Sequence, residues 1–160
     1  MNATANNPVS LRTEGDTHVV ITRRFNASPE AVYRAHTDPA LIQRWMLGPD
    51  GWTMPVCISE PRVGGQIRYE WASPGKPGFY LTGEFLELDP GRRLVHVERM
   101  FLPFQTPDNH AETTFEPDGH GTIMTIRMTL PSAEARKQML ASGMEAGMEV
   151  SYQRLESLLA

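Results

Sequence analysis

Cysteine is nearly absent from this sequence of 160 residues, which contains only Cys57. A single thiol can form no disulfide within the chain and no cysteine-based metal site, so we expect a fold without covalent cross-links, suited to the cytoplasm. Long apolar stretches are also missing, since no run approaches the roughly 20 residues that a membrane helix requires. The sequence therefore predicts a protein that does not span a membrane.

Basic residues are outnumbered by acidic ones, and the formal net charge is -4. A nucleic-acid surface needs clustered Lys and Arg side chains to neutralise phosphates. The pairs Arg23-Arg24 and Arg92-Arg93 are too short for such a surface, and we interpret them as solvated strand positions. No nucleic-acid partner is expected.

Residues 1–16 are polar and lack the basic start and the apolar stretch of a secretory signal. We predict that they form a flexible tail. Residues 17–160 are predicted to form one domain, because a chain of this length with 40% hydrophobic residues can bury enough surface for a single core.

Motifs for metal binding and for the common catalytic mechanisms are also missing. The histidines show no ligand spacing, and His110-Ala111-Glu112 lacks the downstream cysteine pair that a zinc deaminase needs. There is no nucleophile elbow, no phosphate loop and no dinucleotide fingerprint. We therefore expect no metal, no cofactor and no catalytic residue, and we interpret the histidines as strand or surface residues with satisfied hydrogen bonds, namely His18, His36, His96, His110 and His120.

The first third of the chain predicts one strand followed by two short helices. β-Branched residues favour a strand over 18–25. Ser28-Pro29-Glu30 then provides an N-cap and a first-turn proline for a helix that reaches about His36. Asp38-Pro39 repeats this signal for a helix over 40–45, which the Gly48 to Gly51 segment must end.

The middle of the chain predicts an antiparallel meander. Short segments with strand composition are separated by turns rich in Gly, Pro and Asp. Pro55 cannot donate to a strand ladder, so it indicates an edge strand or a bulge. The predicted strands are 52–59, 66–71, 79–87, 94–101, 110–115 and 122–130.

Residues 132–160 predict one long C-terminal helix with Ser132 as its cap. Apolar or small residues recur at steps of three and four, and such a stripe must be buried against the sheet. The stripe consists of Leu140, Met144, Met148, Ser151, Leu155, Leu158 and Leu159. A curved sheet wrapped around this helix satisfies all of these elements.

From about residue 18 to the C-terminus, the sequence resembles the Activator of Hsp90 ATPase homologue 1-like family of the START-like (SRPBCC, Bet v 1-like) superfamily. The resemblance rests on Ile21 to Phe25, Ala27 to Pro29, Val32 to Ala35, Thr37 to Pro39, Trp45, Pro61 to Gly65, Gly83 to Phe85, Arg93 to Val95, Gly121-Thr122 and Gly143 to Leu155. It implies an α+β helix-grip fold with six or seven antiparallel strands. Met148 stands where relatives often carry Trp, which would alter the shape of a cavity there.

The helix-grip fold implies a cavity between the sheet and the C-terminal helix. The sequence contains many aromatic and methionine side chains, which can line such a cavity and can equally fill a core. The candidates are Trp45, Trp52, Met54, Tyr69, Trp71, Phe79, Glu98, Met100, Met144, Met148 and Tyr152. Gly143, Gly147 and Ser151 form a strip of small residues that either allows close helix packing or leaves room for a ligand.

Three functions follow from the resemblance. The first is a non-enzymatic domain that binds an apolar or aromatic small molecule. The second is modulation of the Hsp90 ATPase or another protein interaction, although the eukaryotic activators use an additional N-terminal domain for which 160 residues leave no room. The third is an aromatase/cyclase-like enzyme, whose catalytic residues would have to be among Glu98, His96, Tyr69 and Arg68. A homodimer is a further expectation, because residues 100–104 would expose an apolar patch if they form a loop.

Overall fold

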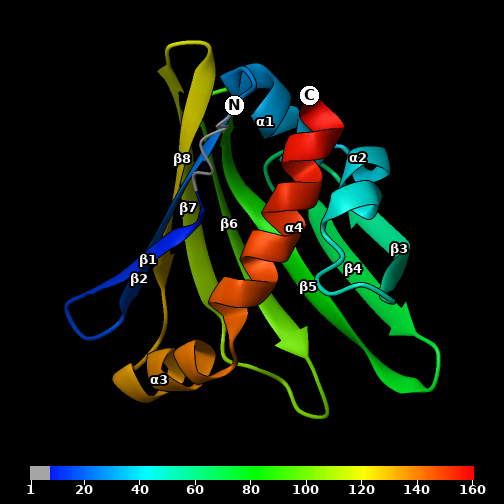
Figure 1. The fold of residues 1–160 in the computed structure, drawn as a ribbon. Coiled ribbons are helices and arrows are strands. Elements are labelled where there is room, and N and C mark those ends of the chain that lie inside the picture. The colour runs from blue at the N-terminus through cyan, green and yellow to red at the C-terminus, as the bar shows by residue number, and fades with distance from the viewer. Residues whose placement is uncertain (1–7) are drawn as a thin grey trace.

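The computed structural model describes residues 8–160 and contains one large curved antiparallel sheet with four helices (Figure 1). The strand order is β1-β2-β8-β7-β6-β5-β4-β3, and α4 crosses one face of the sheet. The strands are β1 (Ser10–Glu14), β2 (His18–Phe25), β3 (Thr53–Ser59), β4 (Gln66–Ser73), β5 (Lys76–Asp89), β6 (Arg93–Phe101), β7 (Asn109–Asp118) and β8 (Gly121–Thr129). The helices are α1 (Pro29–Thr37), α2 (Pro39–Trp45), α3 (Ala133–Ala141) and α4 (Met144–Leu159). The predicted α+β helix-grip class is confirmed, with eight strands rather than six or seven.

The two short helices begin at the predicted caps. The Ser28 side chain accepts a hydrogen bond from the Ala31 N–H at 3.2 Å, and a proline occupies the first turn. The Asp38 side chain accepts from the Ala40 N–H at 2.9 Å and so starts α2 directly after α1. These caps satisfy N–H groups that have no partner inside a helix.

The meander from β3 to β8 is confirmed, and several strands are longer than the sequence predicts. The most extended is β5, a strand of 14 residues. The register between β3 and β4 shifts between Thr53 and Val56, where Pro55 lies, and β3 is the edge strand of the sheet. Both expectations for this proline are therefore correct.

The predicted tail contains a strand that sequence reasoning missed. Residues Ser10–Glu14 form β1, which pairs antiparallel with β2 from Ser10 opposite Thr22 to Glu14 opposite His18. The boundary at residue 17 is therefore too late. A short edge strand of mainly polar residues has no apolar alternation to reveal it. Residues 1–7 of the predicted tail lie outside the described residues.

The expected long C-terminal helix is present as α4, but the prediction that one helix spans 132–160 is wrong, because that segment forms two helices, α3 and α4. Gly143 has φ = +78° and separates α3 from α4, since glycine adopts this left-handed conformation without strain. Ser151 and Leu155 of the predicted stripe are buried, as is Tyr152 beside them. The remaining stripe residues are partly buried and pack against the core.

One face of the sheet is turned toward α4, and we call it the inner face. Arg23 of β2 forms ion pairs with Glu149 and Glu156 of α4, and the Phe25 ring lies 5.5 Å from the Tyr152 ring. Directly paired residues of neighbouring strands share a face, as do alternate residues along a strand. The register of β2, β8, β7, β6 and β5 therefore gives a row of residues across the inner face. This row consists of Val19, Met128, Ala111, His96 and Phe85.

Candidate functional site

Aromatic and soft side chains meet on the inner face of β4, β5 and β6. Glu98 lies two residues after the inner-facing His96, and Met100 two residues later. Met100 pairs with Leu81, and Leu81 pairs with Tyr69, so all three share the inner face. Trp71 pairs with Phe79 one step further along. We name the set of Tyr69, Trp71, Phe79, Glu98 and Met100 the inner strip.

The rings of the inner strip stack in sequence. The Trp71 and Phe79 rings are 4.9 Å apart at an interplanar angle of 20°, and the Tyr69 ring meets Trp71 edge-on at 5.9 Å. Trp52 adds an edge contact to Phe79 at 5.2 Å. The Trp71 indole N–H donates to the Met46 carbonyl at 2.8 Å, which fixes this ring against the segment after α2. The result is a preformed aromatic surface.

The N-terminal half of α4 leaves part of this surface uncovered. The buried residues of α4 are Ser151, Tyr152 and Leu155, and no residue of the helix before Ser151 is buried. Solvent still reaches Glu98 and His96, whose side chains are 24% and 17% exposed although they lie on the covered face. Trp71, Phe79 and Met100 are likewise only partly buried. The inner strip is therefore accessible beside α4.

A polar cluster lies at one end of the inner strip. His96 Nε2 and Glu98 Oε1 are 2.6 Å apart and hydrogen-bonded. Asn109 of β7 lies directly opposite Glu98 and is only 3% exposed. Among residues 8–160, four buried side-chain atoms lack a hydrogen-bond partner, and they are His36 Nε2, His96 Nδ1 and both amide atoms of Asn109. Each unpaired buried group lowers the stability of the fold by about 1–3 kcal/mol, and the unpaired atoms of His96 and Asn109 can still form hydrogen bonds.

Two tyrosine hydroxyls lie within electrostatic reach of Glu98. Burial raises the pKa of the Tyr69 hydroxyl far above its usual value, and electrostatic interactions with Cys57 and Glu98 add to the rise. Burial also raises the pKa of Tyr152, and Glu98 and Glu149 reinforce this effect while Arg23 opposes it. Both hydroxyls therefore stay protonated and can donate hydrogen bonds.

The other predicted cavity residues are distributed over the core and a second hollow. Trp45 and Tyr152 are buried and stack on each other with 5.8 Å between ring centroids. Met54 is buried in the core, and Met148 of α4 packs against the core. Met144 instead lines a separate groove beyond α4.

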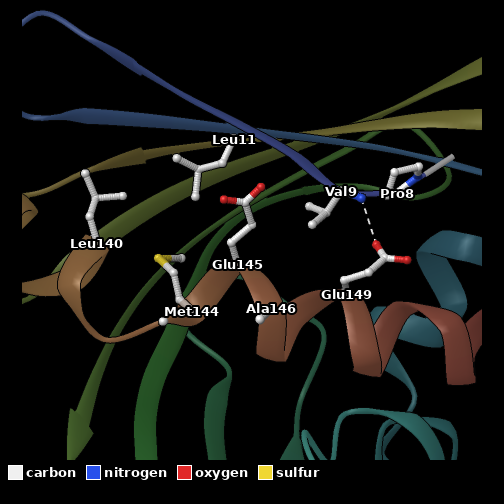
Figure 2. A pocket seen from close by; sticks show the side chains of 9 residues that line it. Pro8, Val9, Leu11, Leu140, Met144, Glu145, Ala146 and Glu149 are labelled. Carbon is white, nitrogen blue, oxygen red and sulfur yellow. Dashed lines mark hydrogen bonds between the residues drawn. The ribbon is translucent and has the colours of Figure 1, made fainter.

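That groove lies between β1 and the junction of α3 and α4, with a volume of about 630 Å³ (Figure 2). Its apolar lining comes mainly from Val9, Leu11, Leu140 and Met144. Glu149 reaches back across the groove to accept a hydrogen bond from the Val9 N–H at 2.7 Å. This contact ties the chain before β1 to α4 and closes one end of the groove.

Several residue interpretations from the sequence need correction. Arg23 is not solvated, since it is 3% exposed and paired with α4. His36 and His96 do not have all their hydrogen bonds satisfied. Arg68 pairs with Thr82 on the outer face, with its guanidinium 4.5 Å from the Tyr80 ring centroid, so it cannot join Glu98. No pattern in the sequence pointed to Asn109, which begins a strand after a polar loop.

The small residues Gly143, Gly147 and Ser151 do not act together as one strip. Gly143 provides the left-handed break before the helix. The Ser151 hydroxyl accepts a hydrogen bond from the Gly48 N–H at 2.9 Å. A Cβ atom at Gly147 would meet no atom within 4 Å, so this glycine is not required for close packing.

Other candidate groups contribute no site of their own. Burial raises the pKa of Cys57 to about 11, which makes its thiol unreactive. Of the segment 100–104, Met100 and Phe101 belong to β6 and only residues 102–104 form an exposed apolar loop, in which Phe104 is 61% exposed. The homodimer stays a prediction. Within residues 8–160, no three His, Cys, Asp or Glu side chains are placed to hold one metal ion. Over the same residues, no helix combines the length and apolarity needed to cross a membrane.

Comparisons with solved structures place this architecture among bacterial proteins. A protein from Rhodobacter sphaeroides is 31% identical, with a TM-score of 0.85 over 94% of this chain and 97% of its own. A protein from Mycobacterium smegmatis is 24% identical, with a TM-score of 0.84 over 96% and 98% of the two chains. A third, from Arthrobacter aurescens, is 25% identical with a TM-score of 0.80, and the alignment covers 94% of this chain and 90% of the other.

Comparison with curated proteins gives no match. A family profile, described as Activator of Hsp90 ATPase homolog 1-like protein, matches residues 26–160. The match begins directly after β2 and includes the inner strip, the polar cluster and α4. The chain therefore belongs to the Activator of Hsp90 ATPase homologue 1-like family of START-like domains.

Proposed function

We propose that this protein binds an apolar, ring-containing small molecule on the inner strip, beside the N-terminal half of α4. The observation that carries the proposal is the partial exposure of Glu98, Trp71, Phe79 and Met100 on the sheet face that α4 covers. A fully packed helix-grip core would bury these side chains. Ligand sites are typically apolar surfaces with a few polar groups, and the inner strip has this composition.

The arrangement suits binding better than catalysis. Glu98 and His96 form one hydrogen-bonded pair and Tyr69 shares their face, but Arg68, the fourth candidate for an aromatase/cyclase, lies on the outer face. The aromatic rings are held in place by stacking and by the Trp71 hydrogen bond, so little side-chain entropy is lost when a flat ligand packs on them. Flat apolar molecules are therefore the expected ligands.

Native mass spectrometry of freshly purified protein tests the proposal first, through the mass of any retained small molecule. A fluorescence titration with N-phenyl-1-naphthylamine, a neutral apolar probe, then measures binding directly. The variant Phe79→Ala removes a ring of the inner strip and should weaken binding roughly 10-fold, since an aromatic contact contributes about 1 kcal/mol or more.

Tyr80→Ala is the matched control, because Tyr80 is the next residue of β5 and stacks on Phe101 on the outer face. This variant should bind the probe as the wild type does. A protein that purifies empty and ignores the probe would contradict ligand binding. Such a result would favour a protein-protein role, in which the exposed Phe104 loop is the first surface to mutate and the Hsp90 ATPase rate is the first assay.

A further inference from the structure

Glu98 is the one carboxylate at the described inner-facing positions of β2 and β4 to β8. At the described inner-facing positions of β2 and β4 to β8, the charged side chains are Arg23 and Glu98, with His96 as a third titratable group. The guanidinium of Arg23 is already engaged by Glu149 and Glu156. No arginine or lysine of these positions is therefore available to receive an anionic ligand near Glu98.

The hydrogen-bonding groups around Glu98 also favour a neutral donor over an anion. An ionised Glu98 accepts from His96 Nε2–H with one oxygen, and its second oxygen can accept another donor. Asn109, directly opposite, has both an amide N–H donor and a carbonyl acceptor without partners. A hydroxyl group can donate to a carboxylate oxygen while it accepts from an amide N–H. A carboxylate group can only accept, so it could bond to the amide N–H of Asn109 but not to the carboxylate of Glu98.

Building on the proposed function, we propose that the inner strip selects ligands whose head is a hydrogen-bond donor without negative charge, an alcohol or phenol hydroxyl on a flat apolar body. Glu98 is the specificity-determining residue, and Asn109 supplies the second hydrogen bond after a side-chain rotation. The aromatic rings bind the body of the ligand and Glu98 rejects carboxylates by repulsion.

A matched series of four naphthalenes tests this selectivity, because all four share the ring and differ in the head. They are 2-methylnaphthalene, 2-naphthalenemethanol, 2-naphthalenemethylamine and 2-naphthoate, each measured by displacement of N-phenyl-1-naphthylamine. We expect the alcohol to bind at least 10-fold more tightly than the carboxylate and several-fold more tightly than the methyl compound. Tighter binding of the amine than of the alcohol would assign the strip to cations and overturn the hydroxyl assignment.

Two variants connect the selectivity to the residues. Glu98→Gln keeps the shape of the side chain, removes its charge and adds an amide donor, so it should raise the affinity for 2-naphthoate and reduce the preference for the alcohol. Glu112→Gln is the control, since Glu112 lies on the outer face and binds Arg93 at 2.6 Å. Asn109→Leu should lower affinity for the alcohol but not for 2-methylnaphthalene, and should raise the melting temperature because it removes two unpaired buried groups.

The outcomes separate this inference from the proposal on which it rests. If all four compounds bind equally and Phe79→Ala weakens them equally, the ligand site stands and the selectivity is refuted. A preference for 2-naphthoate in the wild type would also refute it. If none of the four binds, the inner strip is not a ligand site and both proposals fail.

Discussion

Replacement of Arg23 by methionine tests how the sheet holds the C-terminal helix. Arg23 is 3% exposed, and its Nε and Nη1 atoms lie 3.2 Å and 3.0 Å from the carboxylates of Glu149 and Glu156. Methionine keeps an apolar stem of similar length and removes the charged guanidinium, whose central carbon lies 4.9 Å from the Phe25 ring centroid. Breaking a buried ion pair by removing one partner costs about 3–5 kcal/mol, and the partial exposure of the two glutamates places this site at the lower end.

For a protein of this length, each kcal/mol lowers the melting temperature by about 2–4 °C, so Arg23→Met should lower it by about 6–12 °C. Thermal unfolding followed by circular dichroism measures the shift. Arg24→Met is the matched control, because the neighbouring arginine pairs with the half-exposed Asp118. An exposed pair contributes at most about 1 kcal/mol, so the control should lose no more than about 4 °C. Equal shifts for the two variants would refute the anchoring role of Arg23.

Three further predictions follow from individual residues. Burial lowers the pKa of His36 to about 4 in the folded protein, against 6.5 when unfolded, so stability is retained above pH 6.5 and falls by up to about 3 kcal/mol as the pH drops toward 4. Urea unfolding at several pH values should show this loss in the wild type and a smaller one in His36→Phe, and identical pH profiles would contradict it. Because the pKa of Cys57 is raised to about 11 from 9.0, its alkylation by iodoacetamide at pH 8 should be about 100-fold slower in the folded protein than in urea, and equal rates would show an exposed thiolate. Gly147→Ala should stabilise α4 by about 0.5–1 kcal/mol, since its Cβ meets nothing, whereas Gly83→Ala should destabilise by about 2 kcal/mol or more, because its Cβ would lie 2.2 Å from the Val97 carbonyl oxygen. Chemical denaturation of both glycine variants would reveal a wrong sign in either case.

Much of the fold could be predicted from the sequence because its signals are local. Ser28 and Asp38 are helix caps with proline beside them, and the meander is punctuated by turn residues. The first strand, β1, could not be predicted, since its polar residues are held by pairing with β2 rather than by burial. The break at Gly143 was missed because an interior glycine is compatible with a helix, so the residue type alone does not reveal its positive φ angle.

The candidate site was only partly predictable, because strand alternation defines two faces without saying which one is covered. Glu98 and Arg68 were both candidates for an aromatase/cyclase site, and only the register of the sheet separates them onto opposite faces. Asn109 and Arg23 carry no local signal at all. Their importance comes from burial beside residues that are distant in the sequence, the first against Glu98 and the second against α4.

The central claim is that a ligand lies on the inner strip rather than in the groove beside β1. Methionine side chains report on both, since Met100 belongs to the inner strip, Met144 lines the groove and Met124 is fully buried in the core. NMR spectra of protein labelled with 13C-methyl methionine would be recorded during a titration with 2-naphthalenemethanol. We expect the Met100 methyl signal to shift while those of Met144 and Met124 stay in place. A shift of Met144 alone would place the ligand in the groove, and no shift at any methionine would contradict the ligand site.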